Sequence, residues 1–208
     1  MTLLSPIGRV FRTQVLRKKR LEMVSKYTSG AILDVGCGPA DIVHFLYGER
    51  HFHSEGRAQY IGIDVSRELV EDLKKKYPSL TFFSLDVDNE DLPPHVSRSR
   101  FDTILLVAVI EHLKNPEKVL MKASNLLRDN GRLIITTATP IGERIHNVLA
   151  VIGLTSKEAV KEHKRAARAA YSFQNLTDLF GPSGLEIEFY QRFEFGLNQM
   201  VVLRKRGD

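Results

Sequence analysis

The chain has 208 residues, 43% of them hydrophobic and 26% charged, which excludes wholesale disorder and fits one domain with a sizeable core. The formal charge of +5 is uneven, with +6 on residues 1–26, −4 on residues 27–143 and +3 on residues 144–208, which disfavours a uniformly basic nucleic-acid binder. The longest apolar run, Ile104–Ile110, is too short for a membrane helix, and the single cysteine excludes an internal disulfide, so we expect a cytoplasmic protein without a transmembrane segment.

From residue 30 onward, short β-branched runs alternate with stretches of helical spacing. Five strands are predicted before residue 140, at 31–35, 59–64, 80–85, 101–107 and 132–137. Helices are predicted between them, over 42–46, 67–77 and 117–128. Two last strands, 185–193 and 199–204, are close enough in sequence for an antiparallel hairpin. The pattern predicts an α/β fold, with a doubly wound, mostly parallel seven-stranded sheet, helices on both faces and an antiparallel C-terminal strand.

Two segments stand apart from this alternation. Residues 6–27 are predicted to form a basic helix, with expected buried positions at Val10, Val15, Leu16 and Met23. Residues 141–180 separate the fifth strand from the final pair. Since the chain shows no internal repeat and no low-complexity linker, we expect residues 1–208 to form a single domain that these segments decorate.

A glycine turn after the first predicted strand is the strongest chemical signal. Gly36 and Gly38 would allow a sharp turn and a close approach of a ligand to the main chain. A dinucleotide would place its pyrophosphate here, and Asp34 and Asp41 would repel it. The turn therefore favours a ligand with cationic parts and no phosphate over the NAD of a dehydrogenase, and S-adenosylmethionine has that character.

These residues resemble the first motif of the class I, Rossmann-like S-adenosylmethionine-dependent methyltransferases. The motif, acid-x-Gly-x-Gly-x-Gly, is matched by Asp34, Gly36 and Gly38, with Ala40 in place of the third glycine. The resemblance extends from about residue 32 to residue 140. It is greatest to the small-molecule branch, which includes quinone and lipid-precursor methyltransferases.

The later motifs of the family follow in the same order along the chain. The resemblance implies that Asp64 binds the two ribose hydroxyls, that Asp86 lies beside the adenine amino group, and that Val107 lies beside the methionine part. Glu111 and His112 are similar to a Leu-Glu-His turn of the small-molecule branch. The implied cofactor contacts are Asp34, Gly36, Cys37, Gly38, Asp64, Val65, Asp86, Val87 and Val107.

Each of these positions also has a structural interpretation. Asp34 and Asp64 would serve equally as acids that end strands, and Asp86 belongs to a loop rich in other acids. Cys37 is expected to be a small filler in the turn, because no histidine pairs with it in a motif and the family needs no thiol. Asp102 is expected to orient a strand or turn without touching the ligand.

His112 is the candidate catalytic residue. Just past the fourth strand, it would remove a proton from an acceptor hydroxyl, or instead cap a helix and fix the turn at Glu111. His146 and His163 lie in the unassigned segment, where they either contact substrate or face solvent. No cluster has metal-ligand spacing, so the expected reaction is an in-line displacement without a metal.

The acceptor is expected to meet the two basic segments, as the family usually covers its site with such elements. Their basic residues are Arg9, Arg12, Arg17, Lys18, Lys19, Arg20, Arg144, Lys157, Lys161, Lys164, Arg165 and Arg168. These suit an anionic or membrane-associated acceptor, and a solvated helix face is the alternative. Three aromatic residues, Tyr171, Phe173 and Phe180, either line an apolar pocket or pack the insertion.

The preferred hypothesis is a small-molecule methyltransferase. Methylation of RNA or protein is a second hypothesis, which the basic ends favour and the absence of an RNA module or catalytic cysteine motif disfavours. A third is a non-catalytic protein that binds S-adenosylmethionine or a partner. The sequence indicates neither the atom that is methylated nor the oligomeric state.

Overall fold

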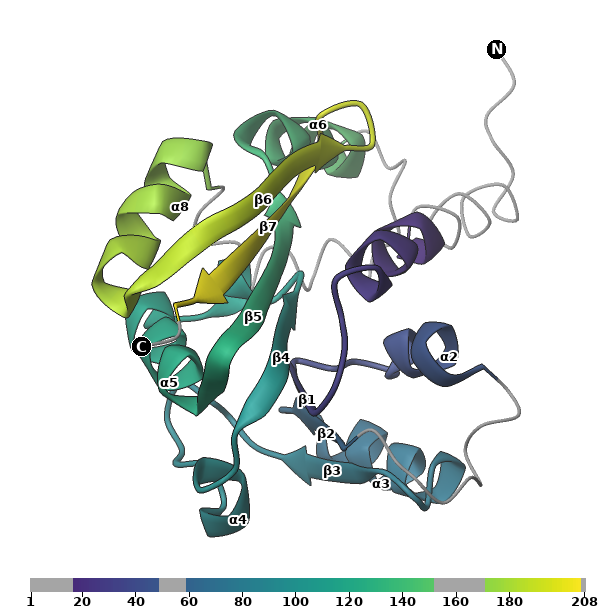
Figure 1. Ribbon diagram of the computed structural model, residues 1–208. Helices are drawn as coiled ribbons and strands as arrows, with labels where there is room; N and C mark the ends of the chain where they lie inside the picture. Colours follow the sequence, from purple (N-terminus) through teal and green to yellow (C-terminus); the bar gives the residue numbers. More distant parts are fainter. Residues whose placement is uncertain (1–16, 49–58, 152–170, 207–208) are drawn as a thin grey trace.

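The computed structural model describes residues 17–48, 59–151 and 171–206 (Figure 1). Seven strands form one sheet in the order β3-β2-β1-β4-β5-β7-β6. Strands β1 to β5 pair in parallel, β7 runs antiparallel to β5, and β6 runs antiparallel to β7. The predicted doubly wound, mostly parallel sheet with an antiparallel C-terminal strand is confirmed.

The element boundaries follow the predicted periodicity. The strands are β1 (Ile32–Val35), β2 (Tyr60–Asp64), β3 (Thr81–Ser84), β4 (Phe101–Val107), β5 (Leu127–Ala138), β6 (Leu185–Phe193) and β7 (Asn198–Lys205). The helices are α2 (Asp41–Tyr47), α3 (Arg67–Lys76), α4 (Pro94–Ser97), α5 (Pro116–Leu126), α6 (Pro140–Val151) and α8 (Phe173–Phe180), with 3₁₀ turns η1 (Ile110–His112) and η2 (Gly181–Ser183).

The junction of α5 and β5 was placed wrongly by the sequence pattern. The helical spacing continues to Arg128, but α5 ends at Leu126. Leu127 pairs with Phe101 in the sheet and is buried, and the pairing then shifts so that Thr103 is opposite Arg132. Burial of Leu127 against β4 therefore overrides local helix propensity, and β5 begins five residues before the predicted strand.

Alternate residues of the central strands enter two hydrophobic cores, one on each face of the sheet. Leu106 belongs to the core that includes residues of α5 and α8, and Leu105 belongs to the core that includes residues of α2 and α3. Figure 1 shows α5 and α8 on one face and α2 and α3 on the other. Because β4 is buried on both faces, its sequence is a nearly continuous apolar run.

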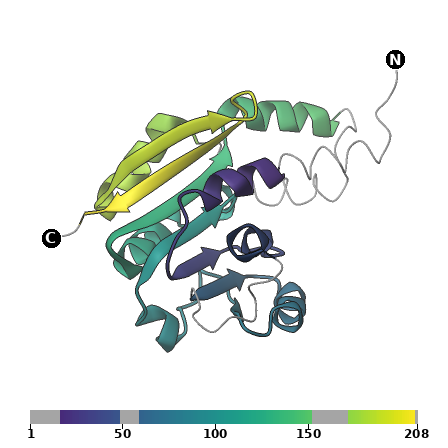
Figure 2. The same cartoon turned by 45° about the vertical axis from the view of Figure 1, so that its right-hand side comes forward.

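Residues 17–25 form the described part of the predicted N-terminal helix (Figure 2). Its buried residues are Leu21 and Val24, whereas Met23 is only half-buried. Leu21 and Val24 join the core that includes Ile134 of β5. The other expected buried positions, Val10, Val15 and Leu16, lie outside the described residues.

The segment 141–180 contains α6 and α8 in its described parts. Phe180 is buried in the core, so it packs the insertion and does not line a pocket. Phe173 lies against Tyr190 of β6, with ring centroids 4.4 Å apart. Within the described ranges, no helix combines the length and the apolar character needed to cross a membrane.

Candidate functional site

The glycine turn between β1 and α2 directs its main-chain donors into the protein. The amides of Gly36 and Cys37 both donate to the carbonyl of Ile63, over 2.7 and 2.9 Å. The Gly38 amide donates to Asp64 Oδ2 over 2.9 Å. A phosphate-binding turn needs such amides to face the ligand. The turn therefore lets a ligand approach the main chain closely, but the amides of residues 36, 37 and 38 already donate to acceptors within the protein.

The two glycines of the turn are required for different reasons, although both have the left-handed backbone. At Gly36, with φ 69°, an added Cβ would lie 2.4 Å from Cγ2 of Val109. At Gly38, with φ 52°, it would meet only Arg17 Nη2, at 3.9 Å, among the described atoms. The space over Gly38 is thus a cradle that a side chain would fill, which fits a ligand that approaches the main chain. Ala40, in place of the third glycine, has φ 55°.

Asp64 at the end of β2 has the acceptor geometry that a ribose diol needs. Its carboxylate is half-buried and accepts one amide on each oxygen, from Gly38 and from Ser66, each over 2.9 Å. A carboxylate oxygen accepts two hydrogen bonds, so both oxygens keep capacity for a ligand hydroxyl. Val65, the next residue, is exposed.

Asp34 lies beneath the turn rather than on its surface. It is buried, and Tyr60 donates its hydroxyl to Asp34 Oδ2 over 2.8 Å. Burial raises the pKa of Asp34 to about 7, partly offset by the Tyr60 hydrogen bond. Asp34 therefore does not repel a pyrophosphate as strongly as the sequence argument assumed, and it supports the turn from within.

Cys37 is a buried filler. Burial, followed by the charges of Asp34 and Asp64, raises the pKa of the Cys37 thiol. A raised pKa disfavours the thiolate, so Cys37 is unsuited to act as a nucleophile. Its sulfur lies close enough to β2 that a Cβ on Gly62 would approach it to 3.0 Å.

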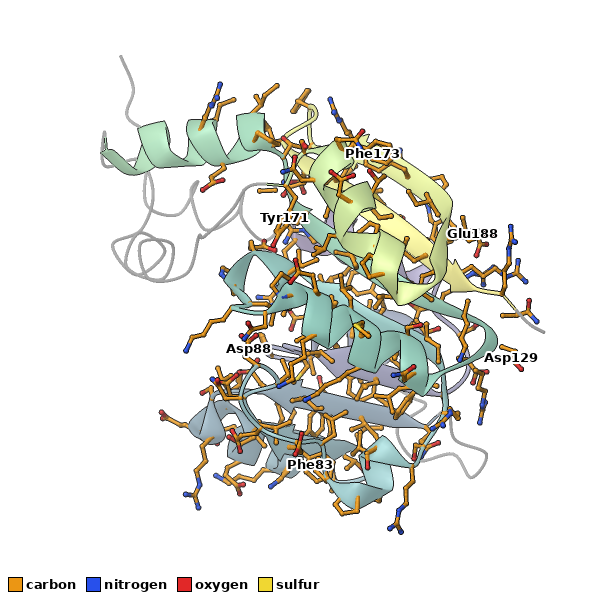
Figure 3. The ribbon with its side chains drawn as sticks, turned by 90° about the vertical axis from the view of Figure 1, so that its left-hand side faces the viewer. Phe83, Asp88, Asp129, Tyr171, Phe173 and Glu188 are labelled. Carbon is orange, nitrogen blue, oxygen red and sulfur yellow. The ribbon has the colours of Figure 1, made fainter. Side chains whose placement is uncertain are left out.

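The loop after β3 divides its acids between two tasks. Asp86 is half-buried, accepts from Asn89 Nδ2 over 2.7 Å, and has a lowered pKa mainly because of that hydrogen bond. Asp88 is buried and accepts the amides of Lys114 and Asn115, each over 2.9 Å (Figure 3). Asp88 thereby ties the β3 loop to the start of α5. Its role was missed, because in the sequence it is one more acid in a polar loop.

The chain after β4 is held in an uncommon conformation at the same edge of the sheet. Val107 is half-buried, and Ala108 has φ 56° while its amide donates to both the carbonyl and the hydroxyl of Thr136. Non-glycine residues with positive φ often mark functional sites. His112 follows in η1, where its side chain is exposed.

The helix 17–25 lies over the glycine turn. Arg17 Nε lies 3.0 Å from Asp41 Oδ2 at the start of α2. This ion pair offsets the charge of Asp41, so Asp41 would repel a pyrophosphate less strongly than the sequence indicated. The turn is still unsuited to a pyrophosphate, because its amides donate into the protein and not toward a ligand. His163 lies outside the described residues, as does the side chain of His146.

Val87 is the last predicted site residue within the described ranges, and the predicted structural role of Asp102 is confirmed. Val87 is half-buried and packs against the core. Asp102 accepts the amide of Ala31 over 2.7 Å and pairs with Arg128 over 2.6 Å, and so fixes the entry to β1. The residues that the resemblance implies as cofactor contacts thus lie at the carboxyl ends of β1, β2, β3 and β4, where open α/β sheets bind ligands.

Comparisons with known proteins agree with this geometry. A family model described as a methyltransferase domain matches residues 28–180. The (S)-coclaurine N-methyltransferase of Papaver somniferum is 30% identical over 105 residues, which are 50% of this chain and 28% of that enzyme. The ubiquinone/menaquinone biosynthesis C-methyltransferase of Desulfotalea psychrophila is 23% identical over 180 residues, which are 81% of this chain and 70% of that enzyme.

A solved structure with the same fold is the magnesium protoporphyrin IX methyltransferase of Synechocystis, crystallised with S-adenosylhomocysteine. It superposes with a TM-score of 0.63 at 15% identity and covers 99% of this chain and 90% of that one. The chain spans about a quarter of the plant enzyme that it matches. Because the family model covers most of the chain, and the sheet order and glycine turn agree with it, the chain belongs to the class I S-adenosylmethionine-dependent methyltransferases.

Proposed function

We propose that this protein transfers the methyl group of S-adenosylmethionine to a small-molecule acceptor by in-line displacement without a metal. The observation that carries the proposal is the glycine turn, whose amides of residues 36, 37 and 38 donate inward and whose surface at Gly38 is open. When bound, the cofactor supplies a methyl group already activated by its sulfonium. The protein then needs to bind, align and exclude water.

Each cofactor-side residue has a proposed task. Asp64 would accept the ribose hydroxyls on its free lone pairs, and Gly38 would allow the ligand to approach the main chain. Asp86 and Val87 would border the adenine, and Val107 the methionine part. Asp34 and Cys37, both buried, would shape the turn from below without direct polar contact.

The small-molecule character of the acceptor is supported by the names of the relatives. One is an N-methyltransferase of coclaurine, one a C-methyltransferase of quinone biosynthesis, and one a methyltransferase of magnesium protoporphyrin IX. The first two are named for different atoms, nitrogen and carbon, so the feature shared by the three is a small acceptor and not one chemistry.

A membrane-associated acceptor is supported by exposed positive charge near the site, which would attract an anionic bilayer. Lys18 and Lys19 of the N-terminal helix and Arg144 of α6 are exposed. The basic residues from 157 to 168 lie outside the described residues. If this charge binds the protein to a membrane, the apparent KM for an acceptor carried in anionic vesicles should rise with salt between low and physiological ionic strength, and an unchanged KM would exclude such binding.

His112 is proposed as a general base for a hydroxyl acceptor. Its exposed side chain follows β4 at the cofactor edge. His112→Ala should lower turnover with little change in cofactor affinity. His95→Ala is the matched control, because His95 is also exposed but belongs to α4 and contacts Phe83. Equal turnover in both variants would assign His112 a structural role.

Calorimetry tests the cofactor directly. S-adenosylmethionine and S-adenosylhomocysteine should bind, and NAD should not. Release of S-adenosylhomocysteine in the presence of a panel of small amines, phenols and quinols should then reveal turnover. Binding of NAD alone would overturn the proposal, and cofactor binding without turnover on any acceptor would favour the non-catalytic alternative.

A further inference from the structure

Three charged side chains from distant parts of the sequence lie near one another beside the cofactor edge. Arg20 belongs to the helix 17–25, Glu111 to η1, and Glu194 to the turn after β6. Arg20 Nη2 donates to Asn198 Oδ1 over 3.2 Å, and Asn198 Nδ2 donates to Glu194 Oε2. Burial lowers the pKa of Arg20, while the charges of Glu194 and Glu111 act in the opposite direction, so both carboxylates lie near the guanidinium. We call Arg20, Glu111 and Glu194 the acceptor-side triad.

Each member of the triad keeps a buried polar atom without a partner. Arg20 Nε, Glu111 Oε2 and Glu194 Oε1 are inaccessible to solvent and accept or donate no hydrogen bond within the part of the chain that the structure describes. Such atoms are costly to bury, and more so when they are charged. A link that served only to join the helix to the hairpin would need one carboxylate, and Glu194 already reaches Arg20 through Asn198.

The backbone that presents Glu194 is also strained. Glu194, Phe195 and Gly196 have φ values of 54°, 58° and 80° in succession. Left-handed conformations are unfavourable for residues other than glycine. The result is that Glu194 is only 8% exposed while Phe195 is fully exposed. A turn that only joined two strands would place Gly or Asn at these positions, so the strain holds Glu194 inward for another reason.

The triad lies next to the cofactor turn. Asn198 pairs with Ala138, the last residue of β5, which places the hairpin turn at the carboxyl edge of the parallel strands. Arg20 and Arg17 are three residues apart and so share a face of their helix. Because Arg17 lies over the glycine turn, Arg20 is presented one helical turn away from it. Thr137, whose hydroxyl is also buried without a partner among the described residues, precedes the last residue of β5 on the same edge.

The charges of the triad define what it would bind. Two carboxylate oxygens require hydrogen-bond donors, and Arg20 Nε requires an acceptor. Two further cations act on the triad, but Arg17 pairs with Asp41 and Lys19 is exposed to solvent, so the remaining charges are one guanidinium and two carboxylates. Burial raises the pKa of Glu194, and a cation placed beside it would lower that pKa again. A second anion would add to the excess negative charge. We propose that the triad is the acceptor-recognition site, an inference that rests on the proposed function. The triad selects a small molecule that presents N–H or O–H groups and carries no net negative charge. A cationic amine is preferred over a neutral alcohol.

The surface and the interior of this region would then have different tasks. The exposed lysines and arginine can bind the protein to an anionic membrane, while the interior selects the donor-bearing head group of an acceptor held there. Of the two expected acceptor types, the membrane-associated one is therefore compatible with the triad, and the anionic one is not.

Three benzyl compounds that differ only in their head group test the proposal. Benzylamine, benzyl alcohol and benzoate are added at millimolar concentration to protein saturated with S-adenosylhomocysteine, and binding is followed by ligand-observed NMR. Benzylamine should bind most tightly and benzoate most weakly. In Glu194→Gln, benzylamine binding should weaken about tenfold, as expected for a hydrogen bond to a charged group. Tighter binding of benzoate than of benzylamine, or no preference among the three, would overturn the proposal.

A matched control separates recognition from folding. Glu186→Gln changes the same residue type at the opposite end of the hairpin, where Glu186 pairs with Arg206 on the surface. It should leave the order of the three compounds unchanged. If Glu194→Gln does not fold, Glu111→Gln replaces it with the same expectation. Unchanged benzylamine affinity together with a lowered Tm in the folded variant would show a purely structural role and refute the proposal.

The cofactor measurement keeps the two proposals distinguishable. If S-adenosylhomocysteine does not bind, the proposed function fails, and the three compounds are compared on the cofactor-free protein. The same order of affinities there would still support the triad as a recognition site. A preference for benzoate there would still overturn it.

Discussion

The cofactor side and the acceptor side of the same sheet edge treat their polar atoms in opposite ways. At the glycine turn, amides and the Asp64 carboxylate bond to one another, so that the protein completes most of its own hydrogen bonds and offers an open shape at Gly38. At the acceptor-side triad, charged atoms are buried without partners among the described residues. We therefore expect the cofactor to be recognised mainly by its shape, and the acceptor by the hydrogen bonds that it makes to the unpartnered charged atoms.

The largest effect is expected at Gly36, where shape is most constrained. Gly36→Ala adds a Cβ 2.4 Å from Val109 at φ 69°, which combines overpacking with a strained backbone and should cost about 3 kcal/mol of unfolding free energy. Gly184→Ala is the matched control, since Gly184 has the same left-handed φ of 69° but a Cβ there would meet no described atom within 4 Å. It should cost only about 1 kcal/mol. Equal losses in urea unfolding would show that Val109 yields and that fit is not limiting.

Asp64 tests whether the cofactor side also uses hydrogen bonds to the ligand. Asp64→Ala removes an acceptor for two hydroxyls and the partners of the Gly38 and Ser66 amides. We expect cofactor affinity to fall about a hundredfold, since each hydrogen bond to a charged group is worth about 1.5 kcal/mol or more. Calorimetry with S-adenosylhomocysteine measures it. An affinity equal to that of the wild type would place the ribose elsewhere.

Asp34 makes a pH prediction with a definite sign. Its pKa is raised from 3.8 to about 7 by burial, so the folded protein holds a proton that the unfolded chain releases. Its contribution to stability is therefore full below about pH 4, falls as the pH rises to about 7, and is flat above. Asp34→Asn should remove this slope and be more stable than the wild type at pH 8, by roughly 1 kcal/mol or more.

The Asp34 measurement is a difference between two proteins, because other carboxylates with lowered pKa values, such as Glu188 and Asp102, impose the opposite slope on both. Thermal unfolding at several pH values gives the difference in Tm. A difference that does not change with pH would mean that Asp34 is ionised throughout, and that the turn rests on a buried charge.

The sequence predicted the two sides unequally for a physical reason. Strand alternation and the glycine motif are local patterns, so the sheet, the turn at Gly36 and Gly38 and the strand that ends at Asp64 were predicted from the chain alone. Arg20 and Glu194 are 174 residues apart and acquire meaning only when the helix and the hairpin meet. Asp88 was missed likewise, because its partners at Lys114 and Asn115 lie across the fold.

The smallest expected effect concerns the ion pair that joins the two sides. Arg17 and Asp41 are both partly exposed, so Arg17→Ala should lower the free energy of unfolding by only about 0.5 kcal/mol, and less at high salt. If the cofactor is recognised by shape, its affinity should also change little in Arg17→Ala, because the shape at Gly38 depends on the main chain. If Arg17→Ala instead weakens both the cofactor and benzylamine tenfold, the helix 17–25 couples the sides. Recognition by fit and recognition by charge would then be one event, in which the same helix closes over both ligands.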